Sequence, residues 1–284
     1  MREFLKYLIF FLLFAIPTAI RAVDIANSPV AKSPHNLASW ATATDDRAIV
    51  KIKAVSETEI CKFCHVPHGA IATPLWGHRL STATYRAFSS ATLLSPRNQP
   101  DGGSKQCLSC HDGTIAVGDT IYGNILVTAI GGNYLTPDGK LTSHSGVLFG
   151  TDINNPVNPN HPKHPISIAV TNSLVAAKNA QGVWKLRNLE SNACGSGKTG
   201  FIGSINGSPV NCDGSEQLYP LRPTIYSYNG SKNPDGTGMQ CTTCHEPHNN
   251  QYGNFMREQI SFSNWSCAHS PSIGGDFCYH CHTQ

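Results

Sequence analysis

The chain of 284 residues contains little charge and little methionine. Asp, Glu, Lys and Arg together make up 14% of it, and Met occurs three times. Residues 1–22 hold Arg2, Lys6 and Arg21 against Glu3, so removing them lowers the formal charge from +3 to +1. A charge this small cannot drive counterion release from a phosphate backbone, which excludes a nucleic-acid partner.

Long apolar runs are also missing, except for one near the N-terminus between Tyr7 and Ile16. Basic residues precede this run, and Pro17 and the small residue Ala22 follow it, which predicts a secretory signal peptide over residues 1–22. A membrane span needs about 20 apolar residues, so a retained anchor is the weaker interpretation. We therefore expect an exported protein without a membrane span after cleavage. It would be extracellular or at the cell surface, with the periplasm as the alternative.

Sustained helical periodicity is scarce, whereas Gly and Pro occur 25 and 18 times. This composition is typical of loops and turns. We expect a few short helices beside the cysteine motifs and short strands in segments such as 121–130 and 146–149.

Cysteine and histidine are abundant, with 11 and 13 copies, and they combine in the pentapeptide Cys-x-x-Cys-His. It occurs four times, beginning at Cys61, Cys107, Cys241 and Cys278. Random placement would give on the order of 0.02 copies, and the pattern is the attachment signature of c-type haem. One tight turn presents both thiols to the vinyl groups of one porphyrin, and the following imidazole lies under the iron.

Other interpretations of the cysteine pairs are weaker. Disulfides would not need the His, a zinc ribbon does not require His after each pair, and a thioredoxin-like site needs one pair only. We therefore predict four covalently bound haem c groups. The predicted thioether residues are Cys61, Cys64, Cys107, Cys110, Cys241, Cys244, Cys278 and Cys281. The predicted proximal ligands are His65, His111, His245 and His282.

The signatures form two clusters, which predicts four regions. The signal peptide is followed by a first haem-pair region with an N-terminal arm, residues 23–118. Residues 119–238 form an insertion without a signature, and residues 239–284 form a second haem-pair region. The predicted fold class is a multihaem c-type cytochrome, mostly loops and turns around a haem-dominated core.

The first signature of each cluster continues in the same way, as His65-Val-Pro-His68 and His245-Glu-Pro-His248, which indicates an internal duplication. Three residues span at most roughly 10 Å, too little to pass around a porphyrin rim. We therefore expect His68 and His248 each to ligate a haem other than the one held by the preceding His. The alternative is a surface His beside a proline turn.

Two further distal ligands are needed if every iron carries two imidazoles. Methionine competes poorly, because only Met239 and Met256 remain after signal removal. We choose His35 and His164, with His161 as the runner-up for the last place. Three other histidines, His78, His144 and His269, fit hydrogen-bonded or solvated roles better, and His280 is a spacer inside its signature.

Several segments resemble a known family. Ser33-Pro-His-Asn-Leu-Ala-Ser39, CKFCHVPHGA from Cys61, Pro74-Leu75-Trp76, CLSCHDGTIA from Cys107, HPIS at 164–167 and CTTCHEPH from Cys241 resemble the doubled-CxxCH multihaem cytochromes c. With four haems in this order, the chain resembles the OmcE-type extracellular tetrahaem cytochromes, which polymerise into filaments. The resemblance implies bis-His haems in a continuous chain, with one axial His donated by a neighbouring subunit. His35, on a short terminal arm, is the candidate for that donor.

Three cysteines lie outside the signatures. Cys194 and Cys212 bracket a loop rich in small polar residues, and a disulfide between them fits an oxidising compartment. Closing a loop of about 18 residues would contribute roughly 3 kcal/mol in the chain-entropy model. Cys267 has no evident partner.

An iron with two imidazole ligands passes electrons but offers no position for a substrate. The sequence therefore favours an electron conduit over an enzyme, with redox-partner cytochromes or extracellular acceptors as partners. The first hypothesis is a filament subunit, the second a monomeric periplasmic or surface shuttle, and the third a multihaem reductase.

Overall fold

The computed structural model describes the chain in several stretches. They are residues 27–42, 51–68, 75–85, 91–94, 99–142, 166–182, 185–186, 189–190, 201–202, 219–220, 222–226, 232–257 and 282–283. Most of these residues lie in turns, bends and irregular segments, as the Gly and Pro content predicted. No helix among them is long and apolar enough to cross a bilayer.

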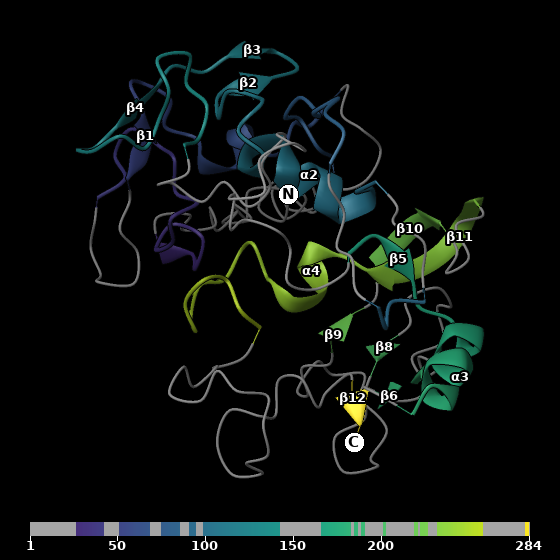
Figure 1. Ribbon diagram of the computed structural model, residues 1–284. Helices are drawn as coiled ribbons and strands as arrows, with labels where there is room; N and C mark the ends of the chain where they lie inside the picture. Colours follow the sequence, from purple (N-terminus) through teal and green to yellow (C-terminus); the bar gives the residue numbers. More distant parts are fainter. Residues whose placement is uncertain are drawn as a thin grey trace, which may run out of the picture.

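The helices are short, and three of the four described ones carry a haem signature (Figure 1). The 3-10 helix η2 (Ile60–Phe63), α2 (Gly102–His111) and α4 (Cys241–Cys244) contain signature cysteines. The remaining helix is α3 (Asn172–Ala180), which begins where the Thr171 hydroxyl accepts a hydrogen bond from Leu174 N at 3.2 Å. It ends at Gly182, whose φ of 73° closes the last turn.

The strands are equally short and form five separate small sheets among the described residues. The N-terminal ones are β1 (Ile52–Ala54), β2 (Asp119–Thr120), β3 (Gly123–Asn124), β4 (Val127–Ala129) and β5 (Ile168–Ala169). Next come β6 (Lys185–Leu186), β7 (Leu189–Glu190), β8 (Phe201–Ile202) and β9 (Tyr219–Pro220). The last are β10 (Arg222–Tyr226), β11 (Lys232–Met239) and β12 (His282–Thr283).

Strand pairing joins the sequence-defined regions. β1 of the first region pairs with β4 at the start of the insertion, with Ile52 opposite Ala129, and β2 pairs with β3 within the insertion. The predicted strand segment 121–130 thus contains β3 and β4, whereas 146–149 lies outside the described residues. The insertion pairs with the second haem region through β5 on β11 and through β6 on β12. The remaining sheet has the order β7-β8-β9.

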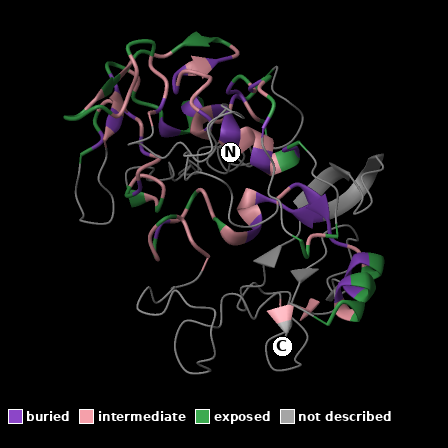
Figure 2. Cartoon of the chain, viewed as in Figure 1, coloured by how far each residue is buried: buried purple, intermediate pink, exposed green. Residues whose placement is uncertain are grey.

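Buried apolar side chains gather in three small clusters rather than one core within the described residues (Figure 2). The first joins β5, α3 and β11 through Ile168, Val170, Val175 and Met239. The second contains Ile52, Val117 and Leu141, and the third contains Tyr85 and Leu108. Figure 1 shows α2 and α4 near the middle of the molecule, with β1, β2, β3 and β4 on one side and β5, β10, β11 and α3 on another.

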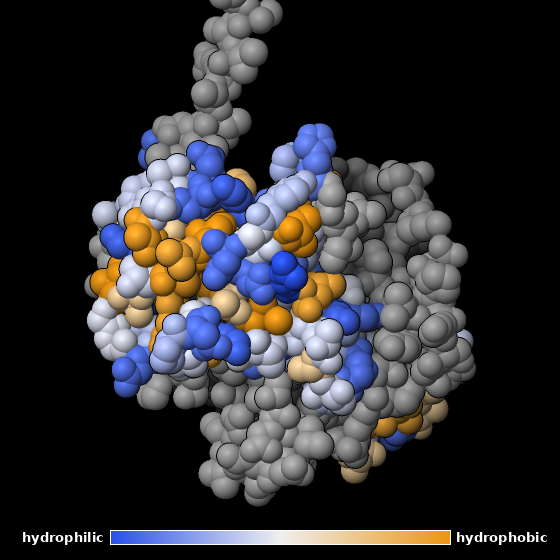
Figure 3. All heavy atoms as spheres, turned by 90° about the horizontal axis from the view of Figure 1, so that it is seen from above, coloured by the Kyte–Doolittle hydropathy of each residue, from blue (hydrophilic) through white to orange (hydrophobic). Residues whose placement is uncertain are grey.

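The surface around β1, β2, β3 and β4 carries several large apolar side chains. Val55, Tyr122, Leu126 and Ile130 are 62%, 60%, 67% and 45% exposed. Figure 3, seen from the side of β2 and β3, shows apolar side chains interspersed with polar ones on this face.

Candidate haem-binding sites

Each of the three described signature pentapeptides is closed by one helical turn. His65 N donates to Cys61 O at 2.7 Å, and His245 N donates to Cys241 O at 3.0 Å. Neither turn extends into a longer helix, because proline lies two residues after each His and disfavours helical geometry in the residue before it. The third described signature occupies the last turn and a half of α2. This geometry holds two thiols and an imidazole on one turn, as covalent haem attachment requires.

The internal duplication extends beyond the motif that revealed it. Residues 61–77 and 241–257 correspond at a constant offset of 180 positions, and their backbones make the same contacts. Val66 N donates to Leu75 O at 3.0 Å, and Glu246 N donates to Phe255 O at 2.7 Å. The Cys64 and Cys244 carbonyls accept hydrogen bonds from the residues at 77 and 257, at 2.8 and 3.1 Å.

The two copies also share an unusual backbone conformation. Leu75 and Phe255, at equivalent positions, both have positive φ angles, 63° and 57°. A bulky residue rarely adopts this conformation, so its presence at the same place in both copies marks a retained local structure. In each copy it turns the chain back so that the following residue, Trp76 or Met256, pairs with the proximal-ligand position.

One predicted proximal His and one predicted distal His, far apart in the sequence, lie close to each other. The ring centroids of His65 and His248 are 6.0 Å apart, with 26° between the ring planes. Two imidazoles on one iron, each with a metal–nitrogen bond of about 2 Å and a ring radius of about 1 Å, place their centroids roughly 6 Å apart. The spacing therefore fits a single iron between them.

A second pair shows the same spacing. The ring centroids of His35 and His111 are 6.1 Å apart, with an interplanar angle of 47°. The ring of His35 also stacks on Phe255, with centroids 4.1 Å apart at 24°. The structure thus places His35 beside His111, a predicted proximal ligand of the same chain.

The hydrogen bonds of these imidazoles are made through Nδ1. His35 Nδ1 lies 3.3 Å from Pro247 O, His245 Nδ1 2.8 Å from Asn254 O, and His282 Nδ1 3.2 Å from Lys185 O. A carbonyl oxygen can only accept, so the hydrogen resides on Nδ1. Metal-ligating histidines usually donate one ring N–H in this way, which fixes the ring and directs the other nitrogen to the metal.

His248 differs because its Nδ1 donates to a carboxylate. Glu246 Oε1 lies 3.1 Å from Nδ1, and the other oxygen of Glu246 lies 3.2 Å from Arg257 Nη2. The hydrogen bond with His248 is the main cause that lowers the pKa of Glu246 to about 2, and the same bond raises the pKa of His248. A carboxylate partner increases the electron-donating character of a ligating imidazole.

Partial loss of contact with water keeps the rings of His35 and His245 neutral. This desolvation, together with the nearby His111, lowers the pKa of His35 to about 4. Burial also lowers the pKa of His245. A neutral imidazole is the form that binds a metal, so both rings are in the required state at neutral pH.

The signature cysteines are available for thioether bonds. Six of them, Cys61, Cys64, Cys107, Cys110, Cys241 and Cys244, form no disulfide. Burial raises the pKa of Cys64 and of Cys110 to about 12, so both remain thiols. Within the described residues no three or more His, Cys, Asp or Glu side chains gather into a group that could hold a metal ion.

A buried donor lies beside the His65–His248 pair. Trp76 Nε1 is buried and has no hydrogen-bond partner among the described residues. Its ring lies edge-on to that of His65, with centroids 6.0 Å apart. An unpaired buried N–H is costly unless a ligand satisfies it, and the carboxylate groups of haem are acceptors of the right kind. The site thus contains the thiols, imidazoles and hydrogen-bond donor that a covalently bound haem would use.

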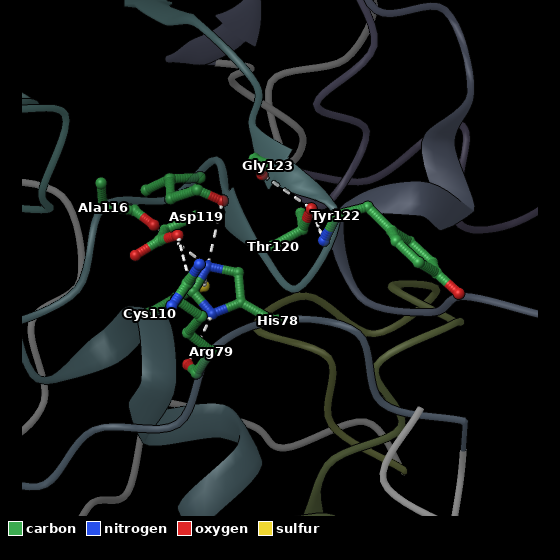
Figure 4. A network of polar contacts seen from close by, with 9 residues as sticks. His78, Arg79, Cys110, Ala116, Asp119, Thr120, Tyr122 and Gly123 are labelled. Carbon is green, nitrogen blue, oxygen red and sulfur yellow. Dashed lines mark hydrogen bonds and ion pairs between the residues drawn. The ribbon is translucent and has the colours of Figure 1, made fainter. Parts of the chain in front are cut away.

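His78 has a different environment, as the sequence led us to expect (Figure 4). It is fully buried, with Nδ1 3.0 Å from Arg79 O and Nε2 3.1 and 3.2 Å from the carbonyl oxygens of Ala116 and Val117. Cys110 Sγ lies 3.4 Å from Nε2. Both ring nitrogens face backbone oxygens, so His78 supports the α2 signature rather than presenting a nitrogen to iron.

The remaining predicted residues fall into two groups. His68 is exposed, and the Tyr122 hydroxyl donates to its backbone carbonyl. The others lie outside the described residues, so the structure does not place them. They are Cys278 and Cys281 of the fourth signature, the distal candidates His164 and His161, the cysteines Cys194, Cys212 and Cys267, and His144, His269 and His280.

Sequence reasoning missed four residues that surround the imidazoles: Trp76, Glu246, Pro247 and Phe255. The offset of 180 positions between the two copies aligns Trp76 with Met256 and Phe255 with Leu75, so it marks both places as repeated but does not indicate their contacts. The contacts of Glu246 and Pro247 with histidine rings depend on the folded chain and have no sequence signal.

A scan against protein-family models finds no match to the chain, and a search of curated proteins finds none either.

Proposed function

We propose that this chain is an electron-transfer cytochrome c that carries four covalently bound haems, each ligated by two imidazoles. The observation that carries the proposal is the spacing of His65 from His248 and of His35 from His111, at 6.0 and 6.1 Å. In both cases the His of a signature is matched by a predicted distal His from a remote part of the sequence.

The small apolar clusters support a haem-filled interior. A chain of this length normally buries one continuous core, whereas the described residues bury three clusters of two to four residues each. Bound haem supplies a reversible one-electron centre and a large apolar surface. The clusters would then serve as supports around the attachment turns.

The protein groups have separate roles in the proposed function. Cys61, Cys64 and their counterparts anchor the cofactor covalently. The paired imidazoles would hold the iron, which would leave it no position for a substrate. Trp76 Nε1 would donate to a haem carboxylate, and Glu246 would set the electron-donating strength of His248. We therefore propose electron transfer without catalysis of a substrate reaction.

The proposed location and assembly rest on the sequence. We propose export through the signal peptide of residues 1–22 and a role outside the cell or at its surface, with electrons passing between redox-partner cytochromes or extracellular acceptors. Polymerisation into a filament is supported by the resemblance to OmcE-type cytochromes and by the exposed apolar side chains of Val55, Leu126 and Ile130. A monomeric periplasmic or surface shuttle is the second candidate, favoured by the placement of His35 against His111 of its own chain.

Intact-mass measurement of the exported protein tests the proposal. The mature chain should gain the mass of four haems, and the double variant Cys61→Ala/Cys64→Ala should lose one of them. Cys194→Ala, which removes a cysteine outside the signatures, is the control and should retain four. A chain without bound haem, or one in which the signature variant keeps the full mass gain, would contradict the proposal. Electron microscopy of the same material separates the assemblies, with filaments supporting the first candidate and single particles the second.

A further inference from the structure

Two of the signature helices, α2 and α4, begin against each other and exchange their N-terminal hydrogen bonds. Gln240, the residue before α4, accepts a hydrogen bond through Oε1 from Ser104 N in the first turn of α2, at 3.0 Å. Ser104 in turn accepts through Oγ from Cys241 N, the first residue of α4, at 3.0 Å. Each helix thus satisfies an N–H group of the other, although their sequences are more than 130 residues apart.

A buried carboxylate and a serine complete the network. Gln240 Nε2 donates to Asp101 Oδ1 at 2.8 Å, and Asp101 precedes α2 without capping it. Ser167 Oγ accepts from Asp101 N at 3.0 Å and lies 3.3 Å from Gln240 Oε1. The side-chain oxygen of Gln240 therefore accepts a hydrogen bond from α2, and its side-chain nitrogen donates one to Asp101, the residue that precedes α2.

The network is shielded from water. Ser104 and Ser167 are 0% exposed, Gln240 is 1% exposed and Asp101 is 5% exposed. In a buried network each missing partner leaves a polar group unpaired, which costs far more than an exposed hydrogen bond contributes. The two helix starts are consequently held in one arrangement, and a β-carbon at Gly103 would already lie 3.1 Å from Thr242 Oγ1.

The attachment points of two haems lie next to this contact. Cys107 is three residues after Ser104, on the same side of α2, and its thiol hydrogen-bonds that of Cys241. These are the first cysteines of the second and third signatures, which belong to the two different haem-pair regions. The two hydrogen bonds between the helix starts therefore determine how close the Cys107 and Cys241 sulfurs lie.

We propose that Gln240 and Ser104 are positioning residues that fix the haem attached at Cys107 against the haem attached at Cys241, and that electrons cross between the two haem-pair regions at this contact. The inference rests on the proposed function, since it presumes bound haems. It adds a specific crossing point and names residues that touch neither iron nor porphyrin attachment atoms.

Two single variants and a double variant that exchanges the amide and the carboxylate test the inference in the haem-loaded protein. In Gln240→Glu the carboxylate still accepts from Ser104 N but faces Asp101 without a hydrogen between them. In Asp101→Asn the amide can turn its oxygen to Gln240, so the effect should be small. The double variant Asp101→Asn/Gln240→Glu restores a donor and an acceptor with their positions exchanged.

The readouts are the Soret circular-dichroism couplet, which reports the mutual orientation of neighbouring haems, and the rate of electron equilibration between haems after photoreduction. Gln240→Glu should lose most of the couplet and slow equilibration, and the double variant should recover both. Ser104→Ala is compatible with a helix and removes the hydrogen bond that Ser104 Oγ accepts from Cys241 N. It should reduce the couplet and slow equilibration. Thr171→Ala removes a cap from α3, which carries no signature, and should leave them unchanged.

Each result bears on one of the two proposals. Four low-spin haems in Gln240→Glu with an unchanged couplet and rate would overturn the positioning role and leave the proposed function intact. The same holds if the double variant recovers nothing relative to Gln240→Glu. If Gln240→Glu does not accumulate, the same two readouts are compared between Ser104→Ala and Thr171→Ala. Weaker readouts in Ser104→Ala alone support the positioning role, and equal readouts in both variants overturn it. A native protein without haem would overturn the proposed function itself.

Discussion

Under the proposed function, replacing Glu246 with Gln should raise the reduction potential of the haem that His248 would ligate. In the native protein the Glu246 carboxylate accepts a hydrogen bond from His248 Nδ1 at 3.1 Å. Electron density drawn toward the iron by this bond stabilises the oxidised state. Gln keeps the shape and an acceptor oxygen but removes the negative charge, so the oxidised state loses part of that stabilisation.

The size of the shift follows from the strength of the bond. A hydrogen bond to a charged group contributes about 2 kcal/mol. If about half of it differs between the oxidised and reduced states, roughly 1 kcal/mol is lost, which corresponds to a rise of roughly 40 mV because a tenfold change in equilibrium constant is 59 mV for one electron. Spectroelectrochemical titration resolves a change of this size in one of four haems.

The shift should not depend on pH near neutrality. The hydrogen bond with His248 lowers the pKa of Glu246 to about 2, so the carboxylate is ionised over about pH 5–8, and its stabilising contribution is lost only as the pH falls toward the lowered pKa. The matched control is Glu57→Gln, since Glu57 pairs with Lys62 of the first signature and touches no imidazole. An unchanged potential in Glu246→Gln, or an equal shift in Glu57→Gln, would refute the reasoning.

Three further changes test other parts of the site. His248→Ala and His68→Ala should each create high-spin character at one haem in the ferric absorption spectrum, because each removes a predicted axial ligand; unchanged low-spin spectra in both variants would show that neither ligates. Trp76→Phe should lower one haem potential by tens of millivolts, because a donor to a haem carboxylate is lost, and a titration identical to that of the native protein would exclude this role. Leu108→Ala should destabilise the protein by about 2–5 kcal/mol in denaturant unfolding, because Leu108 is 0% exposed on α2; a loss below about 1 kcal/mol would mean that α2 is not supported by this side chain.

Local features of the fold were predictable because they depend on neighbouring residues. The pattern Cys-x-x-Cys-His predicts a single helical turn, and proline two residues later predicts its end, as found at His65 and His245. The Gly and Pro content predicted the abundance of loops. The repeated His-x-Pro-His motif indicated a duplication, which the backbone contacts of residues 61–77 and 241–257 confirm.

Contacts between remote segments were not predictable from the sequence. No local pattern says that His35 stacks on Phe255 or that Gln240 caps α2, because these contacts depend on how separate turns pack. The sequence did select His35 and His248 as distal candidates, but not their partners. His35 was expected on an arm reaching a neighbouring subunit, and its burial beside His111 is the least anticipated feature of the site.

Quantitative low-temperature electron paramagnetic resonance of the oxidised protein tests the central claim most directly. The spin count is divided by the chain concentration and by the haem content of the same sample. The account predicts only low-spin ferric signals and four haems per chain, one for each signature. A high-spin signal that integrates to one haem per chain in the fully assembled protein would contradict it.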